Sequence, residues 1–129
     1  MKNAVIYTRS ASPNDQATNA QLAICREYAS AHGYNVVAEF SDNGYSGMNF
    51  DRPAFTAMND SRDKWEILIV YSIDKLSRNQ QKFCSYRKSI RDEGKEIIAT
   101  VEPLSDDTIA MLESLQEHYT IQKREVQRK

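Results

Sequence analysis

The stretch that decides the fold is an apolar run followed by a charged segment: Ile67-Leu68-Ile69-Val70, then Tyr71-Ser72-Ile73-Asp74-Lys75-Leu76-Ser77-Arg78-Asn79. An apolar run this short, bounded by polar residues, is typical of a strand buried on both faces in a parallel sheet. In open α/β sheets, ligands bind at the carboxyl ends of such strands. Because an acid and two cations, Asp74, Lys75 and Arg78, follow the run, the stretch predicts an anion site.

Strand and helix patterns alternate on both sides of this stretch. The predicted strands cover 3–8, 34–40, 65 or 66 to 70, and 96–101; the predicted helices cover 16–32, a short segment from 53, 79–93, and a segment from 106 or 107 onward. Parallel strands joined by helices form right-handed crossovers. The predicted fold class is therefore α/β, a three-layer, mostly parallel sheet of about four to five strands flanked by helices, with a long C-terminal helix.

The chain of 129 residues is long enough for one domain with a single core and too short for two. We expect the core over 1–105 and the start of the long helix over 106–129. That helix carries a narrow seam suited either to the core or to a second subunit: Leu112, Leu115, Tyr119, Gln122 and Val126. It has no glycine or proline stop, so we expect the natural chain to continue beyond Lys129.

Composition excludes several classes of protein. No apolar segment approaches the roughly 20 residues that span a bilayer, and the first residues run directly into a strand pattern, so we expect a soluble, cytoplasmic protein without membrane contact. Cys25 and Cys84 lack metal-ligand spacing and are expected to be unpaired thiols. The net charge is −1. The overall field therefore gives no reason to expect nucleic-acid binding, and any polyanion must be bound locally.

Polar side chains follow three strand patterns at the same predicted edge of the sheet. The residues concerned are Arg9, Ser10 and Ser12, then Arg52, then Asp74, Lys75 and Arg78. Together they would place a hydroxyl among four cations with one carboxylate nearby. Phosphoryl transfer depends mainly on positioning and on positive charge at the phosphate oxygens, and the arginine fork binds two such oxygens at once. The set suits a serine that attacks a phosphodiester.

No carboxylate cluster or His and Cys set in the sequence predicts a metal site. Each residue taken singly also has an ordinary structural explanation. Loop arginines are usually solvated, loop serines usually stabilise turns, and Asp74 is placed to cap the helix that follows it.

Three motifs together resemble the serine site-specific recombinases, which include resolvases, invertases and large integrases. Tyr7-Thr8-Arg9 with the nearby serines is similar to the family's first motif. Gly44-Tyr45-Ser46-Gly47, with Asn49, Arg52 and Pro53, is similar to the second, and Ile73 to Asn79 is similar to the third. Their order and spacing agree with the family, and the likeness covers the chain from Ala4 to about Val126.

This resemblance implies a catalytic domain whose serine attacks double-stranded DNA at a recombination site. The product would be a 5′ phosphoserine link and a free 3′ hydroxyl, formed without cofactor, metal or ATP, and later rejoined within a tetramer made of two homodimers. Arg9, Arg52 and Arg78 would bind the phosphate, and Asp74 would act on the leaving oxygen or hold an arginine. Gln16 and Gln21 would order the serine loop. A DNA-binding region would follow the last helix.

Two positions depart from the family pattern. Lysine stands at Lys75 where the family usually has arginine, so the charge is kept and the fork is lost. Ala11 stands at the usual count for the nucleophile. Counting back from Gln16 and Gln21 selects Ser12, which we expect to be the nucleophile, with Ser10 as the second candidate. A lapsed domain that only dimerises or assembles on DNA is the alternative function. A receiver-like signalling domain is disfavoured, because it needs an acidic pair where this chain has Arg9 and serines.

Overall fold

The computed structural model describes residues 1–101. Over this range the chain forms β1 (Asn3–Ser10), α1 (Asp15–Ala31), β2 (Asn35–Asn43), α2 (Pro53–Asp60), the 3-10 turn η1 (Arg62–Lys64), β3 (Ile67–Val70), α3 (Ile73–Leu76), α4 (Gln80–Asp92) and β4 (Glu96–Ala99). The expected long helix over 106–129, its seam and its boundary with the core lie outside the described residues.

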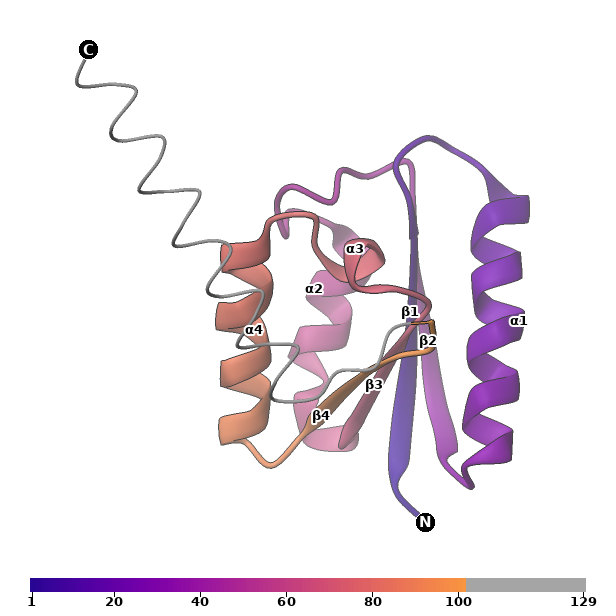
Figure 1. Cartoon of the computed structure of the whole chain (residues 1–129), viewed down its shortest axis with the longest axis vertical. Coiled ribbons are helices and arrows are strands. Elements are labelled where there is room, and N and C mark those ends of the chain that lie inside the picture. Colours follow the sequence, from indigo (N-terminus) through magenta and orange to yellow (C-terminus); the bar gives the residue numbers. More distant parts are fainter. Residues whose placement is uncertain (102–129) are drawn as a thin grey trace, which may run out of the picture.

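The four strands form one parallel sheet in the order β2-β1-β3-β4. One face is covered by α1, and the other by α2 and α4 (Figure 1). The predicted α/β class, with parallel strands and flanking helices, is confirmed. The chain passes from β1 to β2 on one side and then returns from β2 to β3 on the other side of β1. The topological switch point therefore lies between the carboxyl ends of β1 and β3.

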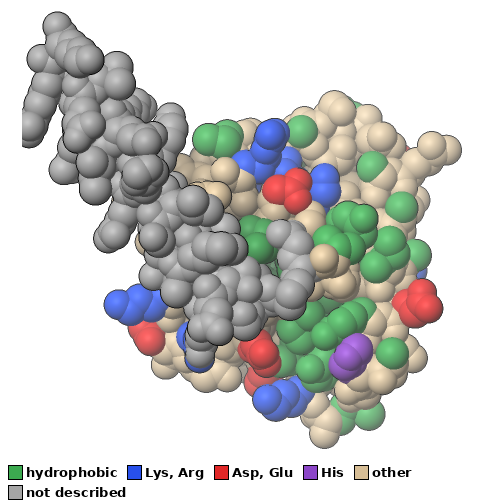
Figure 2. All heavy atoms as spheres, in the orientation of Figure 1, with side chains coloured by type: hydrophobic (Ala, Val, Ile, Leu, Met, Phe, Trp, Pro, Cys, Tyr) green, Lys and Arg blue, Asp and Glu red, His purple; other side chains and the backbone are tan. Residues whose placement is uncertain are grey.

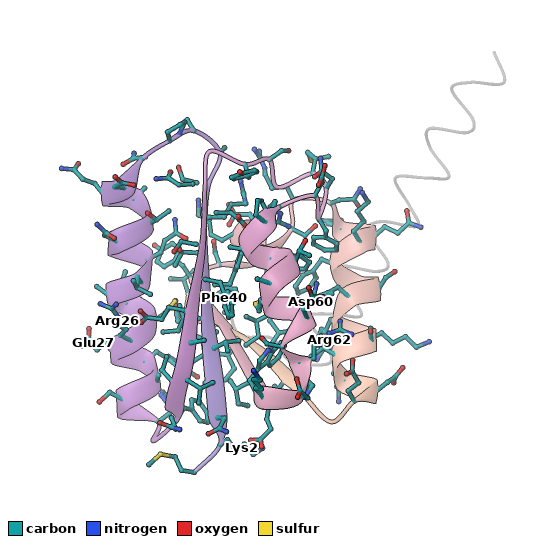
Figure 3. All side chains as sticks on the ribbon, turned by 180° about the vertical axis from the view of Figure 1, so that it is seen from behind. Lys2, Arg26, Glu27, Phe40, Asp60 and Arg62 are labelled. Atoms are coloured by element: carbon teal, nitrogen blue, oxygen red, sulfur yellow. The ribbon has the colours of Figure 1, made fainter. Side chains whose placement is uncertain are left out.

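Alternate side chains of the central strands pack into two separate hydrophobic clusters, one on each face of the sheet. Ala4 and Ile6 of β1 pack with Cys25 of α1, while Val5 and Tyr7 join the larger cluster on the other face. Figure 3 shows side chains filling the space between the sheet and the helices on both sides. All four residues of β3 are buried, as its apolar composition predicted, because helices cover both faces of a parallel sheet.

Two neighbouring strands, β1 and β2, extend further at their carboxyl ends than predicted. The sequence placed Arg9 and Ser10 in a loop, but β1 continues through Ser10 and pairs with β2 as far as Asn43. These polar residues stay in the strands because their side chains find partners, such as the 2.5 Å hydrogen bond between the hydroxyls of Thr8 and Ser41. The longer strands hold Arg9 and Asp42 on a rigid frame.

The segment after β3 forms α3, a single helical turn that the sequence did not predict. The next helix, α4, is capped by Asn79, whose Oδ1 accepts a 3.0 Å hydrogen bond from the Lys82 amide. The suggestion that Asp74 caps this helix is therefore wrong. Asp74 lies inside α3, and its carboxylate accepts a hydrogen bond from the Ser72 hydroxyl.

No helix within residues 1–101 is long and apolar enough to cross a membrane.

Candidate active site

The predicted site residues gather at the carboxyl ends of β1 and β3, the two adjacent strands at the switch point. Arg9 is the next-to-last residue of β1, and α3, followed by Arg78, comes shortly after β3. The segment between β2 and α2 lies at the same end of the sheet (Figure 1). On the surface of this end, Lys or Arg side chains surround an Asp or Glu side chain (Figure 2).

Arg9 is a buried cation with backbone partners on both other segments. Arg9 is only 2% exposed. Its guanidinium donates to the carbonyls of Tyr45 (2.9 Å), Asp74 (2.7 Å) and Lys75 (3.0 Å). Burial, together with the nearby charge of Arg52, lowers the pKa of the Arg9 guanidinium. An arginine nevertheless stays charged in a protein. Arg9 therefore joins the first motif to the second and the third.

The backbone of Arg9 is held by Gln21 of α1. The Arg9 amide donates to Gln21 Oε1 at 3.2 Å, and Gln21 Nε2 donates to the Arg9 carbonyl at 2.9 Å. The pairing of β1 with β3 ends at Tyr7 and Val70. Beyond it, the Gln21 side chain satisfies the backbone N–H and C=O groups of Arg9. Gln16, the other glutamine singled out in the sequence, is exposed in the first turn of α1.

Gly47 lets the second motif pack against the arginines of the other two. A Cβ added at Gly47 would lie 2.6 Å from Cγ of Arg78 and 2.7 Å from Nη2 of Arg9. The Arg78 amide also donates to the Gly47 carbonyl at 2.7 Å. Any side chain at this position would displace one of the two arginines.

Arg52 is 1% exposed and donates in several directions. It contacts the carbonyl of Asn49 (3.0 Å), the hydroxyl of Tyr7 (2.9 Å), the carbonyl of Lys75 (3.3 Å) and, through a short bond, the carbonyl of Leu76. Its Cζ lies 4.9 Å from the centre of the Phe55 ring. Desolvation of a charge is tolerated only with such partners.

Lys75 and Arg78 carry charge that reaches solvent. The Lys75 side chain is 27% exposed, and its Nζ lies 3.8 Å from Oδ2 of Asp74, whose side chain is 55% exposed. Arg78 is exposed. The site therefore has two layers, with Arg9 and Arg52 buried beneath Lys75 and Arg78.

The two candidate serines differ in environment. Ser10 is 8% exposed at the end of β1, and its hydroxyl donates to the Ser12 carbonyl at 2.5 Å. Its own carbonyl accepts from the amides of Gly44 (2.7 Å) and Tyr45 (3.1 Å). Ser12 is exposed in the loop that leads to α1, as is Ala11. Only Ser12 is open to a large substrate.

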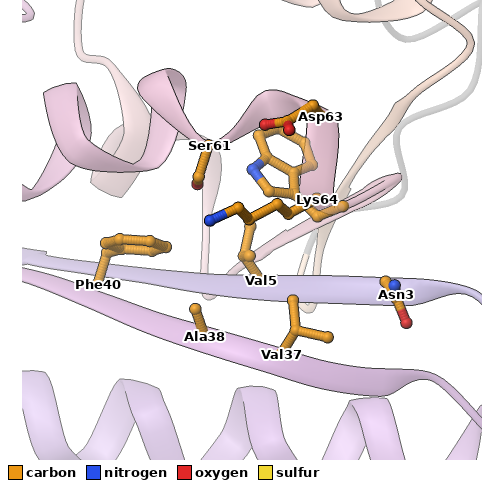
Figure 4. Close-up of a pocket in the computed structure, with 9 residues that line it drawn as sticks. Asn3, Val5, Val37, Ala38, Phe40, Ser61, Asp63 and Lys64 are labelled. Carbon is orange, nitrogen blue, oxygen red and sulfur yellow. The ribbon is translucent and has the colours of Figure 1, made fainter.

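Within residues 1–101, no group of three or more His, Cys, Asp or Glu side chains is arranged to hold a metal ion. A pocket of about 620 Å³ lies elsewhere, between η1 and the amino-terminal parts of β1 and β2 (Figure 4). Trp65, Phe40, Val37 and Lys64 line it. It contains none of the predicted site residues.

Comparison with known proteins identifies the family. The sequence profile described as "Resolvase, N terminal domain" matches residues 4–129. The chain belongs to the family of resolvase N-terminal domains. It is a serine recombinase catalytic domain, and the family predicted from the three motifs is confirmed.

Solved structures of serine recombinases share the fold. The N-terminal catalytic domain of TP901-1 integrase is 25% identical, with a TM-score of 0.81 over 95% of this chain and 99% of that one. A resolvase family site-specific recombinase from Streptococcus pneumoniae is 20% identical, with a TM-score of 0.77 over 97% and 95%. The C-terminal catalytic domain of ISC1926 TnpA, an IS607-like serine recombinase, is 24% identical, with a TM-score of 0.71 over 88% and 79%. No curated protein sequence matches the chain.

Two groups in this recombinase domain were missed by the sequence reasoning. Asp42 at the end of β2 is 2% exposed and accepts hydrogen bonds from the hydroxyl of Tyr7 and from the amides of Ala54 and Phe55. It could have been found as an acid directly following the β2 pattern. Tyr7 opens the first motif, but its hydroxyl was given no role, because Tyr7 occupies an apolar position in a buried strand.

Proposed function

We propose that this recombinase domain cleaves and rejoins double-stranded DNA through a covalent bond to Ser12. The observation that carries the proposal is the interlocking of three distant segments at Gly47, which packs against both Arg9 and Arg78. Such packing brings four cations to the end of the sheet where the exposed Ser12 lies. A serine beside a cationic cluster is suited to attack on a phosphodiester.

In the proposed reaction the Ser12 Oγ forms a bond to phosphorus while the bond from phosphorus to the 3′ oxygen breaks. The serine hydroxyl loses its proton and the leaving 3′ oxygen gains one. Arg9, Arg78 and Lys75 stabilise the charge on the non-bridging oxygens. Asp74 acts on the leaving oxygen or holds a cation, and Gln21, with Gln16, orders the loop. Arg52 completes the cationic set from the buried side.

The reverse reaction rejoins DNA when a 3′ hydroxyl attacks the phosphoserine. Exchange of strands before rejoining requires several subunits, so the proposed assembly is a homodimer that pairs into a tetramer on DNA. Sequence-specific binding would come from the DNA-binding region that the family resemblance implies. With a net charge of −1, the 129 residues supply local rather than overall attraction for DNA.

The test uses the natural full-length protein and a nicked suicide duplex carrying its recombination site. We expect a covalent adduct, and mass spectrometry should locate the DNA on Ser12. Ser12→Ala should abolish the adduct. Ser10→Ala should still form it, with a rate lowered by no more than about tenfold, because it loses one hydrogen bond. An adduct on Ser10 would overturn the assignment of the nucleophile.

Ala11 at the usual nucleophile count and Lys75 in place of arginine favour a second candidate function. In this alternative the domain has lost cleavage and only assembles on DNA. Site-specific DNA binding without an adduct from the full-length protein would support it.

A further inference from the structure

The third motif is shaped by α3, a helix of four residues whose carbonyl end meets arginines. A helix leaves its last carbonyls without partners, and a single turn is not stable alone in water. In α3 the Ile73 carbonyl accepts from the Ser77 amide at 2.9 Å. The three carbonyls that follow, of Asp74, Lys75 and Leu76, all accept from Arg9 or Arg52. The two guanidinium groups therefore cap α3, as cations stabilise helix carboxyl ends.

Arg52 has little capacity left for another ligand. Its bonds to Asn49, Tyr7, Lys75 and Leu76 occupy four of the five N–H groups of a guanidinium. It is 1% exposed. Its Cζ also lies within 5.5 Å of the ring centres of Tyr7, Phe50 and Phe55. Arg9, by contrast, uses three of its N–H groups in hydrogen bonds to carbonyls.

Tyr7 and Asp42 fix Arg52 from behind. The Tyr7 hydroxyl donates to Asp42 Oδ2 at 2.7 Å and accepts from Arg52 Nη1 at 2.9 Å. Burial raises the pKa of the Tyr7 phenol, so the hydroxyl keeps the proton that it donates. Asp42 in turn binds the amides of Ala54 and Phe55 at the start of α2, the helix that Arg52 precedes. A chain of buried hydrogen bonds thus runs from β2 through β1 to α3.

We infer that Tyr7, Asp42 and Arg52 are positioning residues, which act on the reaction by holding the carbonyl end of α3 and so the placement of Lys75 and Arg78. This inference rests on the proposed function. It gives Arg52 a role other than the phosphate contact that the family resemblance implies. Arg52 acts through the backbone of the third motif, and Tyr7 and Asp42 act through Arg52.

The test compares two suicide duplexes, one with the normal scissile phosphate and one with a neutral methylphosphonate at that position. A cation that neutralises the phosphate has less to stabilise on the neutral duplex, so its removal costs less there. Arg78→Ala should lose roughly 100-fold in single-turnover cleavage on phosphate and clearly less on methylphosphonate. Arg52→Ala should lose the same factor, relative to wild type, on both duplexes, with DNA affinity unchanged.

Tyr7→Phe provides a second variant that keeps the ring and removes only the hydroxyl. We expect cleavage to fall about tenfold on both duplexes. The matched control is Tyr86→Phe, because the Tyr86 hydroxyl also makes a 2.7 Å hydrogen bond, to Asn59, away from the site. Its cleavage rate should stay within about twofold of wild type, although this variant also loses a hydroxyl that makes a 2.7 Å hydrogen bond. This pair separates positioning from a general loss of stability, and it serves even if Arg52→Ala does not fold.

The inference would be overturned if Arg52→Ala, like Arg78→Ala, lost clearly less cleavage rate relative to wild type on the methylphosphonate duplex than on the phosphate duplex. A Tyr7→Phe rate equal to that of Tyr86→Phe would also overturn it. If the wild-type protein formed no adduct on normal phosphate DNA, the proposed function itself would fail, and the inference with it.

Discussion

Lys75 and Arg78 are the site cations closest to solvent, and they differ in how they can hold a phosphate. Arginine presents a planar fork that binds two oxygens, whereas lysine presents a point charge on a flexible stem. Lys75 is also drawn towards the Asp74 carboxylate, 3.8 Å away. The charge at this position is therefore present but less precisely directed than an arginine would make it.

Lys75→Arg should raise the single-turnover cleavage rate of the full-length protein by roughly three- to tenfold, because it restores bidentate contact with the phosphate. The measurement is the rate of adduct formation on a suicide duplex. Lys95→Arg is the control, since Lys95 Nζ donates to the Trp65 carbonyl at 2.7 Å outside the site and its change should leave the rate as it was. A lower rate for Lys75→Arg would show that lysine is the better residue in this particular site.

At the scale of residues, the sequence placed the charged groups well and their burial poorly. Arg9 and Arg52 were placed in loops, where arginines are usually solvated, but they are 2% and 1% exposed. Their partners explain the difference. Most are backbone carbonyls of segments up to 66 residues away. Every residue type has a backbone carbonyl, so the sequence does not show which carbonyls bind an arginine. The burial of an arginine among backbone carbonyls therefore cannot be predicted from residue types alone.

Dependence on distant parts of the chain also explains which helices and strands could be predicted from the sequence. β3 and α4 were found because their apolar patterns are local in sequence. In contrast, α3 depends on two arginines from β1 and from the start of α2, and without them its carbonyl end would have no partners. The ends of β1 and β2 depend on each other in the same way, because polar residues remain in a strand only when a neighbouring strand satisfies them.

The start of α4 gives a prediction at the scale of elements. Asn79 Oδ1 accepts from the Lys82 amide, so Asn79→Ala removes a side-chain cap and should lower the free energy of unfolding by about 1 kcal/mol. Urea denaturation of the 129-residue chain measures this. Gln81→Ala, an exposed change in the same helix, should alter it by less than about 0.5 kcal/mol. Equal effects of the two substitutions would mean that the cap contributes nothing.

Across the whole molecule, the sheet divides the core into two parts, one next to the candidate active site and one away from it. On one side α2, α3 and α4 pack over the larger cluster, which includes Phe55, Leu76 and Phe83, and α3 carries the third motif. On the other side α1 closes a smaller apolar cluster around Cys25. α1 reaches the site through Gln21 only at its amino-terminal half. The side of the sheet that holds Cys25 therefore serves stability, and a change there tests the fold without touching the charged groups.

Cys25 makes the fold sensitive to alkaline conditions. The thiol is fully buried, and burial raises its pKa from 9.0 to about 12. Above pH 9 the unfolded chain loses this proton while the folded chain keeps it, so stability falls as pH rises. Between pH 8.5 and 10 the free energy of unfolding should drop by about 1 kcal/mol on account of Cys25. Cys25→Ala should reduce the drop in the free energy of unfolding over this pH range by that amount, whatever its stability at neutral pH. Urea denaturation at a series of pH values measures it, and an unchanged drop in Cys25→Ala would mean that the buried thiol is not responsible.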